Sequence, residues 1–277
     1  MSKTSFLANS VLYKEVLNSG GHKVGYLVFN QFFGDPSRKE LGEAFALFQS
    51  QGITELVVDL RYNPGGSTDT QDTLANLIAP LSADNKKMYT YQFNPQLQQD
   101  NFPLLKKKPG FGNVSFSEAV NTINYDKAGT LNLSRVFFIV TGSSASASEL
   151  VINNLKPYMD VKLIGDTTYG KPVGFFPIEI SKYAIYPISF RTINSAGNAD
   201  YYNGFVPDKL SSDGVNKDWG DATEPSLAAA LNYITTGSFG RAAQNRQARL
   251  RMDAQQLIKP VQRKLESNKF TGMYKED

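Results

Sequence analysis

The stretch that decides the fold is VFFIVTGSSASASEL, residues 136–150. Its first five residues are typical of a buried strand, and residues 148–159 carry apolar side chains at helical spacing. Small residues at a strand-to-helix turn allow the backbone to approach closely and leave N–H groups pointing out of the helix start. A serine there could be a nucleophile beside an oxyanion hole. It could equally be an ordinary helix N-cap, and this stretch on its own favours the cap.

Strands and helices alternate on both sides of this turn. Apolar runs predict strands at residues 23–29, 55–60, 87–93, 136–140 and 160–165, and helical spacing predicts helices at residues 35–52, 70–78 and 223–234. The β-α-β order predicts an α/β fold with a mostly parallel sheet and flanking helices. Apolar and polar residues alternate in two runs between residues 175 and 190, which predicts an antiparallel hairpin.

The chain is expected to consist of one core with added segments. We assign residues 1–22 to an N-terminal lead-in and residues 23–236 to the core. Residues 94–134 form an insertion or lid within it, with a helix near residues 117–123. Residues 237–277 are expected to be a basic C-terminal helical tail. Residues 241–277 hold nine Lys and Arg against four Asp and Glu, so the rest of the chain is slightly acidic and shows no signature of nucleic-acid binding.

Residue counts exclude several kinds of site. The 277 residues include no cysteine, which excludes disulfides, thiolate metal sites and cysteine nucleophiles. His22 is the one histidine, so a multi-histidine metal site is impossible and we expect no metal or cofactor. No apolar run approaches the roughly 18 residues of a membrane span. The first residues show no signal-peptide core, which predicts either a cytoplasmic protein or a fragment without its targeting region.

Three loops that follow predicted parallel strands carry residues suited to catalysis. They are RYNPGGS at 61–67, the serine stretch at 141–148, and DTTYGKP at 166–172. Because such loops lie on one side of a parallel sheet, a serine, Lys171 and backbone N–H groups could meet there. Lysine is the natural general base in the absence of a well-placed histidine, and burial can lower its pKa from about 10.4. Each loop taken singly would also be explained as a plain turn or a solvated lysine.

Four motifs carry a resemblance to a known family. DLRYNPGG (59–66), SASASE (144–149) and GDTTYGK (165–171) resemble, in order and spacing, the core motifs of the C-terminal processing (tail-specific) proteases, peptidase family S41. GFVPD (204–208) resembles a fourth motif, so the resemblance spans about residues 23–235. It implies a ClpP/crotonase-like core that hydrolyses peptide bonds through an acyl-enzyme. The substrates would be proteins or peptides bound near a C-terminus, and the location would be the periplasm or cell envelope.

The resemblance also implies roles for individual residues. Ser146 would be the nucleophile and Lys171 its general base, while amides of Ala147 and of the turn at Gly65 and Gly66 would hold the oxyanion. Ser144 and Ser148 share the motif, so the register of the serine stays open.

Two departures from the family pattern bear on activity. Phe175 stands four residues after the lysine, where many members have a glutamine that helps to orient the amine. Glu149 or Thr168 is a candidate to support Lys171 in its place. No PDZ domain, which usually captures substrate C-termini in this family, is evident in the sequence.

These departures keep two other functions open. One is a non-catalytic module that uses the same core to bind peptides or apolar ligands. The other, weaker, is an acyl-thioester enzyme of the crotonase type, for which coenzyme A binding would be the test.

Overall fold

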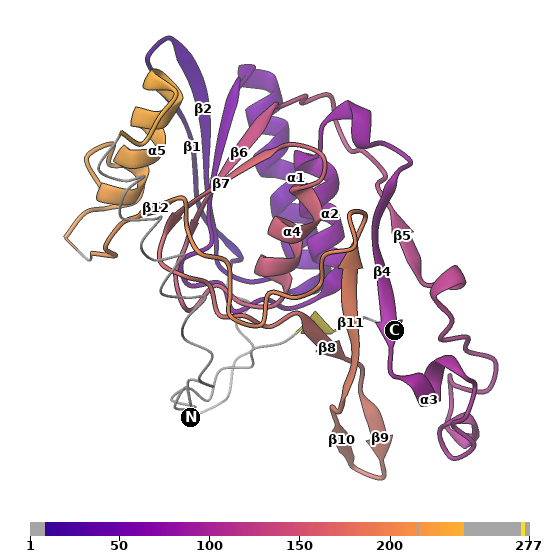
Figure 1. Cartoon of the computed structure of the whole chain (residues 1–277). Coiled ribbons are helices and arrows are strands. Elements are labelled where there is room, and N and C mark those ends of the chain that lie inside the picture. Colours follow the sequence, from indigo (N-terminus) through magenta and orange to yellow (C-terminus); the bar gives the residue numbers. More distant parts are fainter. Residues whose placement is uncertain (1–8, 215, 241–272, 275–277) are drawn as a thin grey trace, which may run out of the picture.

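A six-stranded sheet forms the centre of the molecule, whose computed structural model describes residues 9–214, 216–240 and 273–274 (Figure 1). In spatial order its strands are β1 (Val11–Ser19), β2 (His22–Phe29), β3 (Glu55–Asp59), β6 (Arg135–Val140), β7 (Asp160–Gly165) and β12 (Lys209–Leu210). Strand β1 is antiparallel to β2, and all other neighbours are parallel. The carboxyl ends of the parallel strands therefore lie side by side at the same end of the sheet.

Helices cover both faces of this sheet. Figure 1 shows α1 (Gly34–Gln51), α2 (Thr68–Ile78) and α4 (Ala147–Leu155) together on one side, and α5 (Pro225–Thr236) on the other. Alternate residues of β2 face opposite layers: Val24 and Tyr26 belong to the cluster around α5, whereas Leu27 and Phe29 belong to the larger cluster around α1, α2 and α4. Burial on both faces explains why strands such as residues 136–140 are continuously apolar.

A second, smaller sheet extends from one end of this core. Its strands, in order, are β13 (Met273–Tyr274), β8 (Val173–Phe175), β11 (Ile188–Asn194), β4 (Lys87–Phe93) and β5 (Thr122–Asn124). Between β8 and β11, a hairpin of β9 (Ile178–Ile180) and β10 (Tyr183–Ile185) projects away from the main sheet (Figure 1). The shorter helical elements are α3 (Pro95–Gln98) and the 3-10 turns η1 (Leu81–Ala83), η2 (Leu105–Lys107) and η3 (Glu118–Val120).

The mostly parallel α/β fold, its flanking helices and the antiparallel hairpin confirm the sequence predictions. Strand β1 lies within residues 1–22 and pairs with β2, which the sequence did not indicate. The helix predicted near residues 117–123 was wrong, because only η3 is helical there and β5 pairs with β4. The predicted helical tail lies outside the described residues except for residues 237–240, which are not helical, and β13, which is a strand. No described helix is long and apolar enough to cross a membrane.

Candidate active site

The three loops predicted to converge do contact one another at the carboxyl ends of β3, β6 and β7. The amide of Ala145 donates to the carbonyl oxygen of Asn63 over 3.1 Å, which joins the serine loop to the glycine turn. The amide of Tyr169 donates to the carbonyl oxygen of Ser144 over 3.0 Å, which joins the lysine loop to the serine loop. His22 begins β2, at the other end of the strands, and lies outside this site.

Ser146 is the N-cap residue of α4 and has an unusual backbone, with φ 59° and ψ −110°. Three other non-glycine residues of the described chain have positive φ, and all three are exposed, whereas Ser146 is buried. Such a conformation is strained and persists only where surrounding structure enforces it, and residues of this kind gather at functional sites. The Ser146 turn is therefore held in place by its neighbours rather than by its own preference.

The hydroxyls of the neighbouring serines have structural partners. Ser144 Oγ donates to the carbonyl oxygen of Leu60 over 2.6 Å, and Ser148 Oγ donates to that of Asn63 over 3.0 Å. Ser146 Oγ, although buried, has no hydrogen-bond partner among the described residues. Of the three serines in the motif, Ser146 is thus the one whose hydroxyl is uncommitted.

The glycine turn lies directly against this serine. Gly65 has φ +101°, and a Cβ atom there would stand 2.8 Å from Ser146 Cβ and 2.9 Å from Ala147 N. Only a residue without a side chain can approach so closely. The amide of Gly65 donates to Asn63 Oδ1 over 2.9 Å. Within the described part of the chain, the amides of Ala147 and Gly66 donate to no acceptor, so these two N–H groups are free to donate to a bound ligand.

Glu149 connects the serine turn to the lysine loop. Its buried carboxylate accepts four hydrogen bonds: from the amides of Ser146 (3.0 Å), Gly170 (2.6 Å) and Lys171 (2.8 Å), and from Thr168 Oγ1 (2.6 Å). Burial raises the pKa of Glu149, and the four donors oppose that rise by stabilising the carboxylate. The carboxylate therefore fixes the main chain of both loops. It supports Lys171 through the backbone amide of that residue and not by a hydrogen bond to the side-chain amine.

Lys171 is half-buried at the end of this loop. Burial lowers its pKa below the usual 10.5, while the negative charge of Glu149 acts in the opposite direction. Its Nζ lies 5.4 Å from the centre of the Phe175 ring. No hydrogen bond joins Lys171 Nζ to Ser146 Oγ, because the latter has no partner within the described residues. In this conformation Glu149 links the main chains of the two residues, and their side chains are not hydrogen-bonded to each other.

The fourth motif, residues 204–208, is hydrogen-bonded to the lysine loop. Phe205 N donates to Thr168 Oγ1 over 2.7 Å, and Thr168 N donates to the carbonyl oxygen of Phe205 over 3.1 Å. A Cβ atom on Gly204 would lie 2.1 Å from the carbonyl oxygen of Thr168, so glycine is required at this crossing. Thr168 therefore links Glu149 to this segment, and its role is to hold the loop.

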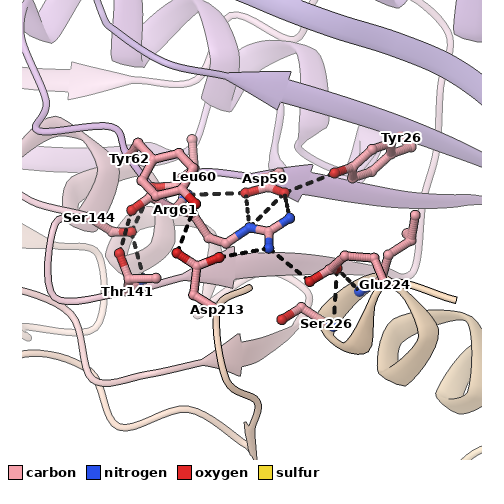
Figure 2. Close-up of polar contacts among 11 residues, drawn as sticks. Tyr26, Asp59, Leu60, Arg61, Tyr62, Thr141, Ser144, Asp213, Glu224 and Ser226 are labelled. Atoms are coloured by element: carbon pink, nitrogen blue, oxygen red, sulfur yellow. Dashed lines mark hydrogen bonds and ion pairs between the residues drawn. The ribbon is translucent and has the colours of Figure 1, made fainter. Parts of the chain in front are cut away.

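A buried ion network behind the site was not predicted. Figure 2 shows Arg61 between the carboxylates of Asp59 (2.7 Å) and Glu224 (2.9 Å), with Asp213 at 3.1 Å and Tyr26 donating to Asp59 over 2.9 Å. The network ties the loop after β3 to the start of α5. The sequence contained a signal for it, since an arginine and an aspartate flank the end of a buried strand, but not the identity of the distant partner Glu224.

Next to the site lies an open cavity of about 880 Å³. Its lining includes Tyr62, Gly142, Ser143, Asp166 and Asp213, but neither Ser146 nor Lys171. The cavity therefore borders the convergent loops but does not include the side chains of Ser146 and Lys171.

Comparison with known proteins places the chain in a family. The model of peptidase family S41 matches residues 23–209. The chain belongs to peptidase family S41.

Relatives and solved structures agree with this membership. A carboxyl-terminal-processing protease of Synechocystis sp. is 26% identical over 221 residues, covering 78% of this chain and 45% of the relative. A probable CtpA-like serine protease of Staphylococcus aureus is 30% identical over 151 residues, covering 54% and 25%. The chain thus spans less than half the length of these relatives.

Among solved structures, a putative S41 protease from Bacteroides fragilis has a TM-score of 0.71 at 28% identity, covering 85% of this chain and 60% of that one. The photosystem II D1 C-terminal processing protease has a TM-score of 0.53 at 20% identity, covering 74% and 48%, which is a likeness of fold.

Proposed function

We propose that this chain is a serine peptidase of the C-terminal processing type, in which Ser146 is the nucleophile and Lys171 the general base. The observation that carries the proposal is the Ser146 hydroxyl, buried and without a partner on a strained turn, beside the unused amides of Ala147 and Gly66. A helix cap would use that hydroxyl to accept from a helix amide, and although Ser146 and Glu149 are arranged as in a capping box, no donor lies within hydrogen-bond geometry of Ser146 Oγ in the described residues.

In the reaction, neutral Lys171 takes the proton of Ser146 Oγ as the oxygen attacks the substrate carbonyl carbon. The amides of Ala147 and Gly66 hold the negative charge that develops on the carbonyl oxygen. The C–N bond then breaks, Lys171 returns the proton to the leaving amine, and an acyl group remains on Ser146. A water molecule hydrolyses this ester, with Lys171 again taking and returning a proton.

The test combines active-site labelling with hydrolysis of an unstructured peptide. We expect a fluorophosphonate probe to modify Ser146, and Ser146→Ala and Lys171→Ala each to lower kcat/KM by at least about a thousandfold. Ser144→Ala and Ser148→Ala are the matched controls, because they remove hydroxyls that are already bonded within the fold. They should keep labelling at position 146. Full activity of the Ser146→Ala protein, or labelling at Ser144 or Ser148 instead, would contradict the assignment.

A non-catalytic peptide-binding module is the second candidate. It is favoured by Lys171 Nζ lying over the ring of Phe175 and by the absence of a Ser146–Lys171 hydrogen bond in the described residues. Burial of Ser146 also means that groups covering it must move before a substrate can reach it. If no fluorophosphonate labelling occurs at any pH while peptides still bind, this second function replaces the first.

The same proposal covers partners and location. The substrates would be proteins or peptides bound near a C-terminus, and no nucleic-acid partner is expected. The protein would be located in the periplasm or cell envelope, as the family resemblance implies. Fractionation of the native protein checks the location.

A further inference from the structure

A chain of buried hydroxyl groups runs from β4 to the first turn of α2. Tyr91 donates to Thr68 Oγ1 over 2.9 Å, and the Tyr89 hydroxyl lies 3.1 Å from that of Tyr91. The Tyr89 hydroxyl also lies 3.2 Å from Asp72 Oδ2, on the second turn of the same helix. Thr68, Tyr89 and Tyr91 are buried. The four side chains thus form one continuous hydrogen-bond chain that begins and ends on α2.

The Asp72 carboxyl group has the surroundings of a neutral acid. Its Oδ1 atom is buried and has no hydrogen-bond partner among the described residues. Burial raises the pKa of Asp72 to about 8; the hydrogen bond from Tyr89 opposes this rise, and the negative charge of Asp69 adds to it. A buried carboxylate is costly where no cation pairs with it, so Asp72 carries a proton at neutral pH.

The groups packed around Asp72 supply no positive charge in the described part of the chain. Asp69 shares its helix, and the tyrosines that face it are Tyr89 and Tyr91 of β4 and Tyr125, the residue after β5. Burial raises the pKa of all three tyrosines, so they stay neutral. Helices α1 and α4 also pack against α2, and neither adds a charge that acts on Asp72.

The order of donors along the chain depends on this proton. When Asp72 is neutral, its carboxyl group donates to Tyr89, and each hydroxyl donates to the next as far as Thr68. When Asp72 is ionised, the carboxylate can only accept, so every hydroxyl in the chain reverses and Thr68 becomes the first donor. The state of Asp72 is therefore transmitted to Thr68 through the two tyrosines.

Thr68 lies two residues after Gly66, at the start of α2. The peptide planes around Gly66 are fixed by the main chain of Phe32, whose amide donates to the carbonyl oxygen of Gly65 over 3.2 Å and whose carbonyl oxygen accepts from Ser67 N over 2.9 Å. Because C=O and N–H point in opposite directions in a trans peptide, the Gly66 N–H points away from Phe32. Thr68, held by Tyr91, is the next attachment of this segment along the chain.

We propose that the chain from Asp72 to Thr68 positions the start of α2 and so orients the Gly66 amide, and that the proton on Asp72 sets its donor order. Tyr89 and Tyr91 are then positioning residues, which act through the helix and not by touching a substrate. The inference rests on the proposed function in one respect, namely that the Gly66 amide would bind the oxyanion.

Nuclear magnetic resonance of the Gly66 amide tests the link without hydrolysis. Glycine labelled with ¹³C at the carbonyl and with ¹⁵N selects the amides that follow a glycine, and these are Gly21 and Gly66. In the unmodified protein we expect the Gly66 resonance to show a titration step near pH 8. The step should be absent from Asp72→Asn, which keeps a neutral donor for Tyr89 but cannot ionise.

Substitutions along the chain test how the effect travels. Tyr91→Phe and Thr68→Val each remove one hydroxyl, so they should shift the Gly66 resonance at neutral pH and abolish the step, whereas Thr68→Ser keeps the hydroxyl and should retain it. Tyr125→Phe is the matched control, because its buried hydroxyl donates to the carbonyl oxygen of Asn154 over 2.8 Å and lies outside the chain. It should retain the step.

Peptide hydrolysis gives a second readout. Tyr91→Phe is expected to lower kcat about three- to tenfold with little change in KM, because a misoriented amide weakens the transition state more than substrate binding. Tyr125→Phe should leave kcat unchanged.

The same Gly66 titration step in the unmodified and Asp72→Asn proteins, or a Gly66 resonance that does not move in folded Tyr91→Phe, would overturn the inference. If Tyr91→Phe does not fold, the comparison with Asp72→Asn decides alone. A protein that shows the step but neither hydrolyses peptides nor reacts with a fluorophosphonate would refute the peptidase proposal and leave this one standing. An active peptidase without the step would refute this inference alone.

Discussion

At the scale of single residues, Glu149 shows how one side chain can position two loops. Its carboxylate accepts bonds from the backbone on both sides of the site, at Ser146 and at Lys171. Hydrogen bonds to a charged acceptor are stronger than neutral ones, about 1.5–3 kcal/mol each. Glutamate three residues after an N-cap serine is a capping-box pattern. Here the carboxylate also accepts hydrogen bonds from the lysine loop, at the amides of Gly170 and Lys171.

The pH dependence of hydrolysis follows from the state of Lys171. The amine can accept the serine proton only when it is neutral, and burial lowers its pKa below 10.5. We therefore expect kcat/KM to rise with pH by about tenfold per unit below that pKa and to level off above it. The measurement is a pH profile with circular dichroism recorded in parallel, to separate the loss of a base from unfolding. A profile that falls as pH increases from 6 to 9, with the fold intact, would exclude neutral Lys171 as the base.

At the scale of elements, the turn after β3 and the start of α4 are built for mutual contact. Gly65 packs its bare Cα against Ser146 and Ala147, and Asn63 fixes the turn by accepting the Gly65 amide and donating Nδ2 to the carbonyl oxygen of Phe29 over 3.0 Å. The Asn-Pro-Gly-Gly turn thus packs against the serine turn, which lies far along the chain, and this contact requires glycine at position 65.

Gly65→Ala is expected to abolish hydrolysis as well as to destabilise the fold. Its Cβ would lie 2.8 Å from both Ser146 Cβ and the carbonyl oxygen of Ala145, so the serine turn must shift. The matched control is Gly110→Ala, where φ is +82° but no atom lies within 4 Å, so only backbone strain of about 1–2 kcal/mol is added. Peptide hydrolysis and urea unfolding of both variants provide the comparison. Equal activity losses at the two positions would show that backbone strain, and not contact with Ser146, causes the effect.

At the scale of the whole molecule, the Arg61 network joins the edge of the sheet that carries the candidate site to the helix on its far face. Arg61, Asp59 and Glu224 are all nearly inaccessible to solvent. Glu224 also caps α5, accepting from the amides of Ser226 (3.1 Å) and Leu227 (2.8 Å). The loop that carries Gly65 and Gly66 therefore begins at a residue fixed from three separate parts of the chain.

Arg61→Ala is expected to lower the free energy of unfolding by about 3–5 kcal/mol, because two buried carboxylates lose their partner. Arg38→Ala is the control, since Arg38 pairs with an Asp35 whose side chain is 88% exposed, and such surface pairs contribute about 0–1 kcal/mol. Chemical denaturation of both variants measures the difference. A loss below 1 kcal/mol at Arg61 would mean that the network is not required for stability.

Much of the fold could be predicted because its signals are local. Continuous apolar strands, helical spacing in residues 35–52 and the glycine and proline turns are all readable within short windows, and parallel β-α-β order follows from them. Strand β1 was missed because its residues are only partly buried and carry no strict alternation. Strand β5 was missed because three residues are too few for any periodicity, and their strand state depends on β4.

By itself, the sequence determined the three motif loops, their order after parallel strands, and the membership of family S41 that those motifs indicate. Only the tertiary structure decided which hydroxyl and which amides have no hydrogen-bond partner. The hydroxyls of Ser144 and Ser148 donate to the carbonyl oxygens of Leu60 and Asn63, and the amide of Gly65 donates to the Asn63 side chain. The hydroxyl of Ser146 and the amides of Ala147 and Gly66 have no such partners in the described residues. The physical reason is that the acceptors of Ser144 and Ser148 lie 84 and 85 positions away in the chain, so each becomes known only when the strands bring their loops together.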